Sequence, residues 1–244
     1  MPPRIRLRAL LALLALTATG ALSLKIPALR HRARTLAGKL RGERSVADRV
    51  AQYGPAARAR WRSWFARAGV AYPPHNVTLL VLKDAGELVL YAPARDGRLR
   101  AVRRMLVVAM SGHAGPKLRE GDRQVPEGMY RIESLNPNSL YHLALRLDYP
   151  NDDDRERARE DGRTQLGGDI MIHGSTGSVG CLAMGDEGAE DLFVLAADTG
   201  FERLRVWIAP TDFRRNATWR PPPGLPSWVE VRYATLRAAL ATLP

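Results

Sequence analysis

Short apolar runs separated by turn-forming residues dominate the chain from about residue 76 onward. Runs of this kind, bounded by Gly, Pro, Asn or Asp, are typical of β-strands. Asp84, Ala85 and Gly86 lie between the first two runs and predict a hairpin turn. The expected strands are Val77–Leu82, Leu88–Tyr91, Met105–Met110, Met129–Ile132, Tyr141–Leu147, Asp169–His173 and Leu204–Ala209.

Three other patterns suggest where segments lie. Met105–Met110 is apolar on both faces, which predicts a central strand. Pro150–Gly168 is polar and charged, which predicts a long surface loop. Pro221–Pro226 predicts a rigid, proline-rich spacer.

Helical spacing occurs on both sides of these strands. Ser45 is expected to cap a short helix that Gly54 and Pro55 end, and a second helix with an aromatic face follows. The residues of that aromatic face, expected to pack on the domain, are Trp61, Trp64 and Phe65.

Two further helices are expected later in the chain. Asp186 is predicted to cap a helix that Gly200 ends, and the tail from Ser227 has the spacing of a short amphipathic helix. The apolar positions are Leu192, Phe193 and Ala196 in the first helix and Val231, Leu236 and Leu240 in the second.

Many short strands with few helices favour a mainly β (α+β) fold over a βαβ arrangement. Residues 25–75 are expected to form a basic linker with short helices, and residues 76–212 hold all the predicted strands. Residues 213–244 hold the proline-rich spacer and a C-terminal helix. The sequence therefore predicts one β-rich domain with flanking short helices.

The positive charge is concentrated at the N-terminus. The net charge is +12, and residues 1–44 contribute +9 of it, from ten Lys or Arg and the single acid Glu43. The remaining 200 residues carry 27 basic and 24 acidic side chains. Because nucleic-acid binding needs a basic face on the folded domain, this distribution argues against a nucleic-acid partner.

Residues 1–24 have the features of an export signal. Arg4, Arg6 and Arg8 precede an uncharged run of 16 residues, Ala9–Leu24, with small residues near Gly20. That run is slightly shorter than the ~20 residues that span a bilayer, so a cleaved signal peptide and an uncleaved signal-anchor both fit. Either predicts a periplasmic or cell-envelope protein, with membrane association through the basic segment.

The chain has a single cysteine, Cys181, so no intramolecular disulfide can form. A buried, inert thiol is the simplest interpretation of an isolated cysteine. The residues that surround Cys181 favour a reactive thiol instead.

Eight positions separate His173, at the end of a predicted strand, from Cys181. The residues between them are small and include Gly174, Ser178 and Gly180, so the chain can turn back sharply. Such a turn can bring an imidazole to the thiol, the pairing that activates a cysteine nucleophile. Gly180 would let a substrate carbonyl approach, and nearby backbone N–H groups would hold the developing oxyanion.

A metal site is the alternative for a His and a Cys in one loop. Neither a Cys-x-x-Cys pattern nor a second His cluster accompanies them, so no metal is expected.

These residues resemble the active-site motif of the L,D-transpeptidase catalytic domain, the YkuD type. His173-Gly174 matches the first part of that motif, and Ser178, Gly180 and Cys181 match its Ser/Thr-His-Gly-Cys part. Val179 stands where the family usually has a second His, and Leu182 stands where many members have Arg. These departures are similar to the YafK-like branch, as are Gly115-Pro116-Lys117, Glu120-Gly121-Asp122, Pro126-Glu127-Gly128-Met129-Tyr130, Leu135-Asn136-Pro137-Asn138-Ser139 and Tyr149-Pro150-Asn151.

The resemblance, over roughly Asn76 to Asp212, implies a catalytic domain at residues 76–212 that acts on peptidoglycan stem peptides without a cofactor. It implies that Cys181 forms a thioester and that His173 moves the proton, with transpeptidation or hydrolysis as the outcome. The YafK-like branch is associated with cleaving a peptidoglycan–lipoprotein link. Lys117 or Arg163 could contact the substrate carboxylate in place of the missing Arg.

Three further alternatives stay open, two for single histidines and one for the class of the protein. His142 is either a satisfied sheet residue or a substrate contact, and His113 is either part of a surface turn or part of the cleft. The whole chain could also be a catalytically silent envelope protein that binds murein or an anionic membrane surface.

Overall fold

The computed structural model describes residues 42–244. Within it, Val46–Pro244 form one compact unit. The expected export signal, residues 1–24, and the first part of the basic linker lie outside the described residues. Among residues 42–244, no helix is both long enough and apolar enough to cross a membrane.

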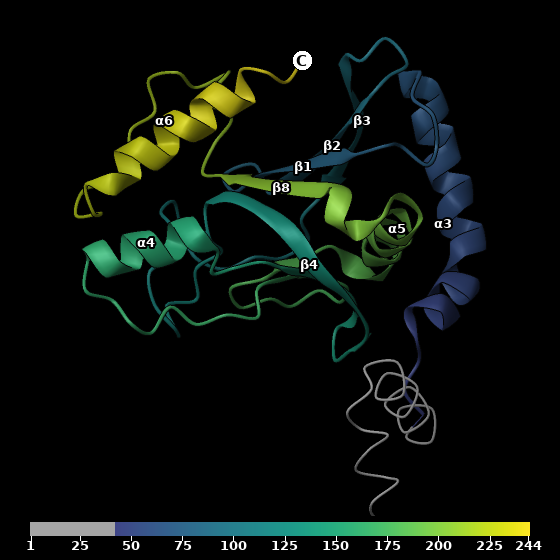
Figure 1. The fold of residues 1–244 in the computed structure, drawn as a ribbon, viewed down its shortest axis with the longest axis horizontal. Helices are drawn as coiled ribbons and strands as arrows, with labels where there is room; N and C mark the ends of the chain where they lie inside the picture. Colours follow the sequence, from purple (N-terminus) through teal and green to yellow (C-terminus); the bar gives the residue numbers. More distant parts are fainter. Residues whose placement is uncertain (1–41) are drawn as a thin grey trace, which may run out of the picture. The chain divides into compact units, whose positions relative to one another are not determined.

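An eight-stranded mixed sheet in the order β3-β2-β1-β8-β4-β5-β6-β7 forms the centre of the unit (Figure 1). Two neighbouring pairs are parallel, β1 with β8 and β6 with β7, and the other pairs are antiparallel. The expected α+β fold is confirmed. The strands are β1 (Val77–Leu82), β2 (Glu87–Pro93), β3 (Leu99–Leu106), β4 (Gly128–Ser139), β5 (His142–Leu147), β6 (Met171–His173), β7 (Leu182–Ala183) and β8 (Leu204–Ala209).

Strand β4 joins the two halves of the sheet. Its first residues, Gly128–Arg131, pair with β8, and the stretch from Ile132 to Ser139 pairs with β5. A shift of register follows Ile132, so the side chains of the second half change face. The long strand thereby places the small β5-β6-β7 end beside the central strands.

The expected central strand at Met105–Met110 is wrong. The strand is β3, which ends at Leu106 and forms the edge of the sheet. Leu106 is 68% exposed, whereas Met105 is 7% exposed. An edge strand with one open face buries only the side chains on its other face. Because Met105 and Leu106 are both apolar, the sequence does not show which of them is exposed.

One face of the sheet is covered by α5 (Gly185–Thr199), with α3 (Val46–Ala68) packed against α5 (Figure 1). The predicted aromatic face of α3 is confirmed, since Trp61 and Phe65 are fully buried and Trp61 Nε1 donates to the carbonyl oxygen of Asp191 at 2.7 Å. The predicted break at Gly54 and Pro55 is wrong, because the helix continues through Pro55. Packing of the buried face outweighs the local cost of one proline.

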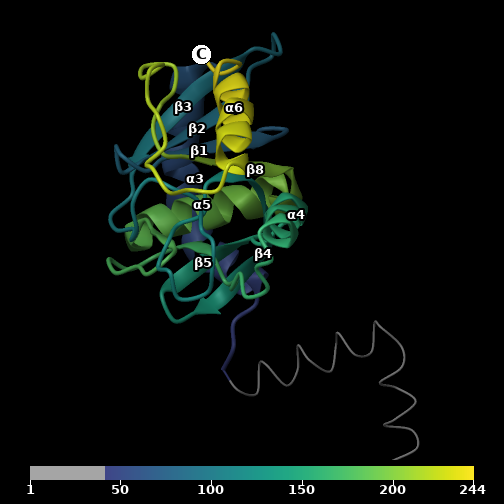
Figure 2. The same cartoon turned by 90° about the vertical axis from the view of Figure 1, so that its left-hand side faces the viewer.

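The opposite face of the sheet carries α6 (Trp228–Leu240), which lies in front of the strands in Figure 2 while α3 lies behind them. Leu236 and Leu240 are buried as expected, but Val231 is 57% exposed. The inward positions follow Val229 and Tyr233 instead, which are nearly fully buried. Val231 is therefore wrongly assigned to the inner face.

The expected loop from Pro150 to Gly168 contains a helix, α4 (Asp152–Glu160). Asn151 caps it and forms a capping box with Asp154. Asp154 also forms an ion pair with Arg232 of α6, at a distance of 3.0 Å. The polar, charged residues of this segment predict a loop. The Asn151 cap and the ion pairs of the segment stabilise a surface helix instead.

Candidate active site

Strands β6 and β7 bring His173 and Cys181 to one end of the sheet. The strands pair in parallel with Ile172 opposite Leu182, so Cys181 lies beside Met171. The Met171 N–H donates to Cys181 Sγ at 3.4 Å. Ile172 and Leu182 are part of the core. Because side chains alternate along strands, His173 and Cys181 both project from the opposite face.

His173 is held in one orientation and one tautomer. Its side chain is buried, and its Nδ1 lies 2.6 Å from the carbonyl oxygen of Gly174. A carbonyl oxygen only accepts, so Nδ1 carries the proton and Nε2 is the basic nitrogen. The ring of Tyr141 covers the imidazole, with ring centroids 4.8 Å apart. These contacts give His173 the fixed geometry that a general base needs.

Gly174 is required by close packing around the turn that follows β6. A Cβ at this position would lie 2.7 Å from Asp186 Oδ1 and 2.9 Å from the carbonyl oxygen of Tyr141. Asp186 does not cap α5 as expected, because the helix begins at Gly185 without a side-chain cap. Its Oδ1 accepts the Ser175 N–H at 2.7 Å instead. Asp186 therefore fixes the loop beside the candidate base.

The Cys181 thiol is partly exposed and sits among backbone groups. Besides the Met171 N–H, it approaches the carbonyl oxygen of Asp169 at 3.5 Å. Burial raises the pKa of this thiol, and the charge of Asp169 acts in the same direction, whereas the Met171 N–H and Lys117 oppose the rise. The resting residue is therefore a thiol, which needs a base to remove its proton.

Gly180 adopts a left-handed backbone, φ +79°, which favours glycine immediately before the cysteine. Its N–H donates to Ser111 Oγ at 2.7 Å, and that hydroxyl donates in turn to the carbonyl oxygen of Arg123. The Gly180 N–H is therefore occupied, contrary to the expected free oxyanion donor. Ser178 Oγ is buried and has no hydrogen-bond partner among the described residues.

His142 lies at the start of β5 beside the Gly174 turn. Its Nε2 is 3.0 Å from Glu190 Oε1 of α5, and its ring meets Tyr53 of α3 edge to face at a centroid distance of 5.1 Å. The ring is thus a satisfied side chain that ties the turn to the helices. Its Cβ would lie 2.9 Å from a Cβ at Gly174, which adds to the crowding there.

A cavity of about 490 Å³ lies next to the Gly180 turn, and His113 and Gln124 are among its lining residues. Lys117 is not one of its lining residues, and its Nζ is bound to Asp122 Oδ1 at 2.6 Å and to the carbonyl oxygen of Arg119. Arg163 does line it, but it is paired with Asp161 at 2.8 Å. Neither cation is free for a substrate carboxylate.

Sequence reasoning missed two residues that shape the site, Tyr141 and Ser111. Tyr141 was placed inside a strand, yet it belongs to the turn between β4 and β5 and lies over His173. Ser111 is 69 positions from Gly180 in sequence. No local pattern connects such distant positions. Over residues 42–244, no group of three or more His, Cys, Asp or Glu side chains is arranged to hold a metal ion.

The model of the L,D-transpeptidase catalytic domain, YkuD, matches residues 72–208, more than half of the chain. Proteins of Escherichia coli strain K12 and of strain O157:H7 that bear the name L,D-transpeptidase YafK are 33% identical over 119 residues. The aligned part is 48% of this chain and 46% of those proteins. The chain thus spans about half the length of these relatives.

The similarity of this chain to solved structures is weaker than its similarity to these sequences. The helical cell shape determining protein Pgp2 from Campylobacter jejuni is 18% identical with a TM-score of 0.45, covering 75% of this chain and 77% of Pgp2. L,D-transpeptidase 1 of Mycobacterium tuberculosis is 14% identical with a TM-score of 0.32, covering 55% and 62%. The family assignment rests on the sequence match.

Proposed function

The chain belongs to the L,D-transpeptidase catalytic domain family, and from this membership we propose that it is a cysteine-dependent enzyme acting on peptidoglycan peptides. Cys181 is the nucleophile and His173 is the general base. The observation that supports the proposal is the pairing of β6 with β7, which brings Cys181 beside Met171, two residues before His173. Nδ1 of His173 is held by the Gly174 carbonyl.

The reaction begins with attack of Cys181 Sγ on a substrate carbonyl carbon. Because burial keeps the thiol protonated at rest, its proton passes to His173 Nε2 during the attack. The bond to the leaving amine then breaks, and His173 returns the proton to that amine. The product is a thioester on Cys181.

The negative charge on the substrate oxygen needs donors that are not already engaged. The Gly180 N–H is bound to Ser111, so the Cys181 N–H and the hydroxyl of Ser178 are the donors in this proposal. An amine acceptor resolves the thioester by transpeptidation, and water resolves it by hydrolysis. Both outcomes use the same two residues.

Location and natural substrate belong to the same proposal. The basic, apolar residues 1–24 export or anchor the chain, so the enzyme works in the periplasm or cell envelope. The resemblance to the YafK-like branch supports peptidoglycan–lipoprotein links as a substrate. A catalytically silent, murein-binding protein is the alternative from a different class.

Intact mass spectrometry of the full chain with purified muropeptides and with lipoprotein-linked murein fragments tests the proposal. We expect a thioester adduct or a product with the wild type and neither with Cys181→Ala. The mass of the product then distinguishes transfer to an amine from transfer to water. Unchanged substrates with both proteins, together with retained murein binding, would favour the silent binding protein.

A second variant tests the role of His173 as the general base. His173→Gln retains a polar side chain of similar length but removes the basic Nε2. We expect it to lower the rate by about two to four orders of magnitude. A rate unchanged by this substitution would remove His173 from the mechanism.

A further inference from the structure

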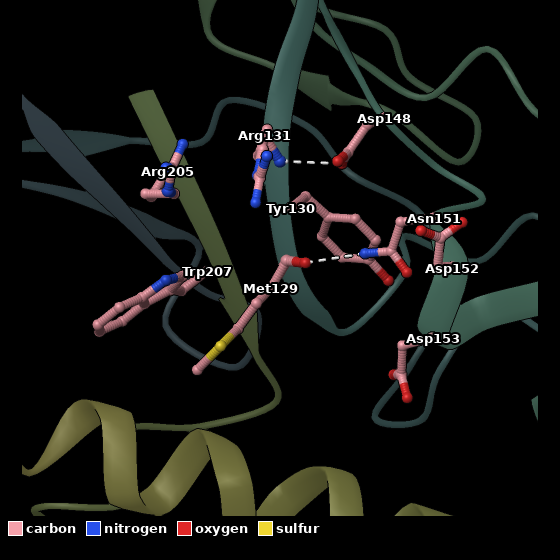
Figure 3. Close-up of a pocket in the computed structure, with 9 residues that line it drawn as sticks. All are labelled: Met129, Tyr130, Arg131, Asp148, Asn151, Asp152, Asp153, Arg205 and Trp207. Atoms are coloured by element: carbon pink, nitrogen blue, oxygen red, sulfur yellow. Dashed lines mark hydrogen bonds between the residues drawn. The ribbon is translucent and has the colours of Figure 1, made fainter. Parts of the chain in front are cut away.

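A second cavity lies on strands β4 and β8, away from the candidate active site. Met129 is opposite Trp207, and Arg131 is opposite Arg205. Residues two apart on a strand share a face, so these four side chains form one patch on the side opposite α5. Figure 3 shows the patch, with Asn151 and the acidic residues of α4 along its border. The cavity has a volume of about 570 Å³.

The two arginines of this cavity have no carboxylate partner among the described residues. Within residues 42–244, the Arg205 guanidinium donates only to the carbonyl oxygen of Glu202 at 3.1 Å, and the Arg131 guanidinium forms no hydrogen bond or ion pair. Like charges directly opposite each other on neighbouring strands destabilise a sheet. A bound anion would remove that repulsion.

Three acids border the cavity, Asp148, Asp152 and Asp153, and two of them have an arginine partner outside it. Asp152 pairs with Arg155 at 3.3 Å. Asp148 Oδ1 accepts the backbone N–H of Arg131 at 2.9 Å. Asp153 is ion-paired with Arg232 at 2.6 Å and with Arg157 at 3.4 Å. Asp148 keeps its negative charge, because a backbone N–H is neutral. Arg131 and Arg205 against this one carboxylate leave an excess of one positive charge in the cavity.

Two guanidinium groups and an adjoining apolar surface are the features of the cavity that would contact a ligand. Both guanidiniums supply N–H donors, and the half-exposed Trp207 and Met129 supply apolar area beside them. Carboxylates have only acceptors, so they match the two guanidiniums, and the excess positive charge favours them over neutral sugar hydroxyls. The volume is ordinary for a ligand the size of a short peptide.

We propose that this cavity binds a short peptide bearing carboxylate groups, with the carboxylates on Arg131 and Arg205 and its aliphatic part against Trp207. The identification of that peptide as a peptidoglycan stem rests on the proposed function. Cys181 immediately precedes β7, and β5, β6 and the second half of β4 separate that strand from the cavity. The cavity thus holds a stem other than the one being cleaved.

Calorimetry with the full chain carrying Cys181→Ala tests this without turnover. The probe is the free tripeptide L-alanyl-γ-D-glutamyl-meso-diaminopimelate. We expect saturable binding that Arg131→Gln or Arg205→Gln each weakens about tenfold or more, since each removes a charge-assisted hydrogen bond. Arg203→Gln, an exposed arginine near the same strand that does not line the cavity, is the matched control and should leave affinity unchanged.

Other outcomes would overturn the inference. No saturable binding, or binding that both arginine variants retain, would exclude the cavity. Binding of peptide-free glycan strands in place of the tripeptide would show a sugar site, and equal competition by inorganic phosphate would show a simple anion site. If the wild type forms no thiol-dependent product but tripeptide binding still depends on both arginines, the proposed chemistry fails and the peptide site stands.

Discussion

The phenol ring of Tyr141 lies over the imidazole of His173, with centroids 4.8 Å apart and planes inclined by 31°. Tyr141 is 52% exposed and His173 is 2% exposed, so the tyrosine separates the base from solvent. The turn between β4 and β5 is therefore part of the candidate active site. Its tip, Leu140, is almost fully exposed.

Replacing this ring tests whether it positions His173. We expect Tyr141→Ala to lower the rate of thiol-dependent product formation by about tenfold, because a loosely held base spends less time in reactive geometry. Tyr141→Phe keeps the ring and should retain most activity. Equal rates in all three proteins would contradict a positioning role.

The state of Cys181 predicts how alkylation depends on pH. Burial raises the pKa of the thiol above its ordinary value, so the thiolate fraction at neutral pH is lower than in a free cysteine. Iodoacetamide should therefore react slowly at neutral pH, and its rate should rise with a midpoint above that of an unstructured peptide cysteine. The unfolded chain, alkylated in denaturant, is the control. A midpoint below the peptide value would instead indicate a resting thiolate–imidazolium pair.

Two glycines of one loop should respond differently to alanine. A Cβ at Gly174 would lie 2.7 Å from Asp186 Oδ1 and 2.9 Å from two further atoms, whereas a Cβ at Gly177 meets nothing within 4 Å. We expect Gly174→Ala to destabilise the fold by about 1–3 kcal/mol and to displace His173, with a large loss of activity. Gly177→Ala should change both quantities little. Urea unfolding and product formation measure the two effects, and equal behaviour would refute the packing argument.

A buried ion pair connects the sheet, a loop and α6. Glu127 Oε1 is 2.8 Å from Lys83 Nζ and accepts the Gly115 N–H at 2.9 Å, and its Oε2 accepts from Tyr233 of α6. Burial lowers the pKa of Lys83, and Glu127 opposes this effect. Glu127→Gln should therefore destabilise the fold by about 3–5 kcal/mol, because it leaves a buried ammonium without its charge partner.

The free energy of unfolding in urea measures that loss. Glu160→Gln is the control, because Glu160 forms only an exposed pair with Arg157 and should cost about 0–1 kcal/mol. Similar losses in the two variants would mean that the buried pair contributes no more than a surface one.

Several misplaced elements have one physical cause. Met105 and its neighbours were assigned to a central strand, and the segment of α4 to a loop, because an isolated pattern does not show what covers each face. Pro55 predicts a helix end, but burial of Trp61 and Phe65 stabilises a helix that continues through this proline. In each case tertiary contacts decided between local alternatives.

The sequence alone predicted most of the strands and a glycine-containing turn between His173 and Cys181. These features depend on near neighbours in the chain, where alternation and backbone freedom are visible in the residues themselves. Only the tertiary structure showed that the Gly180 N–H is bound to Ser111, that Tyr141 covers His173, and that Arg131 lies opposite Arg205. Those relationships join positions far apart in sequence, and strand register and packing set them.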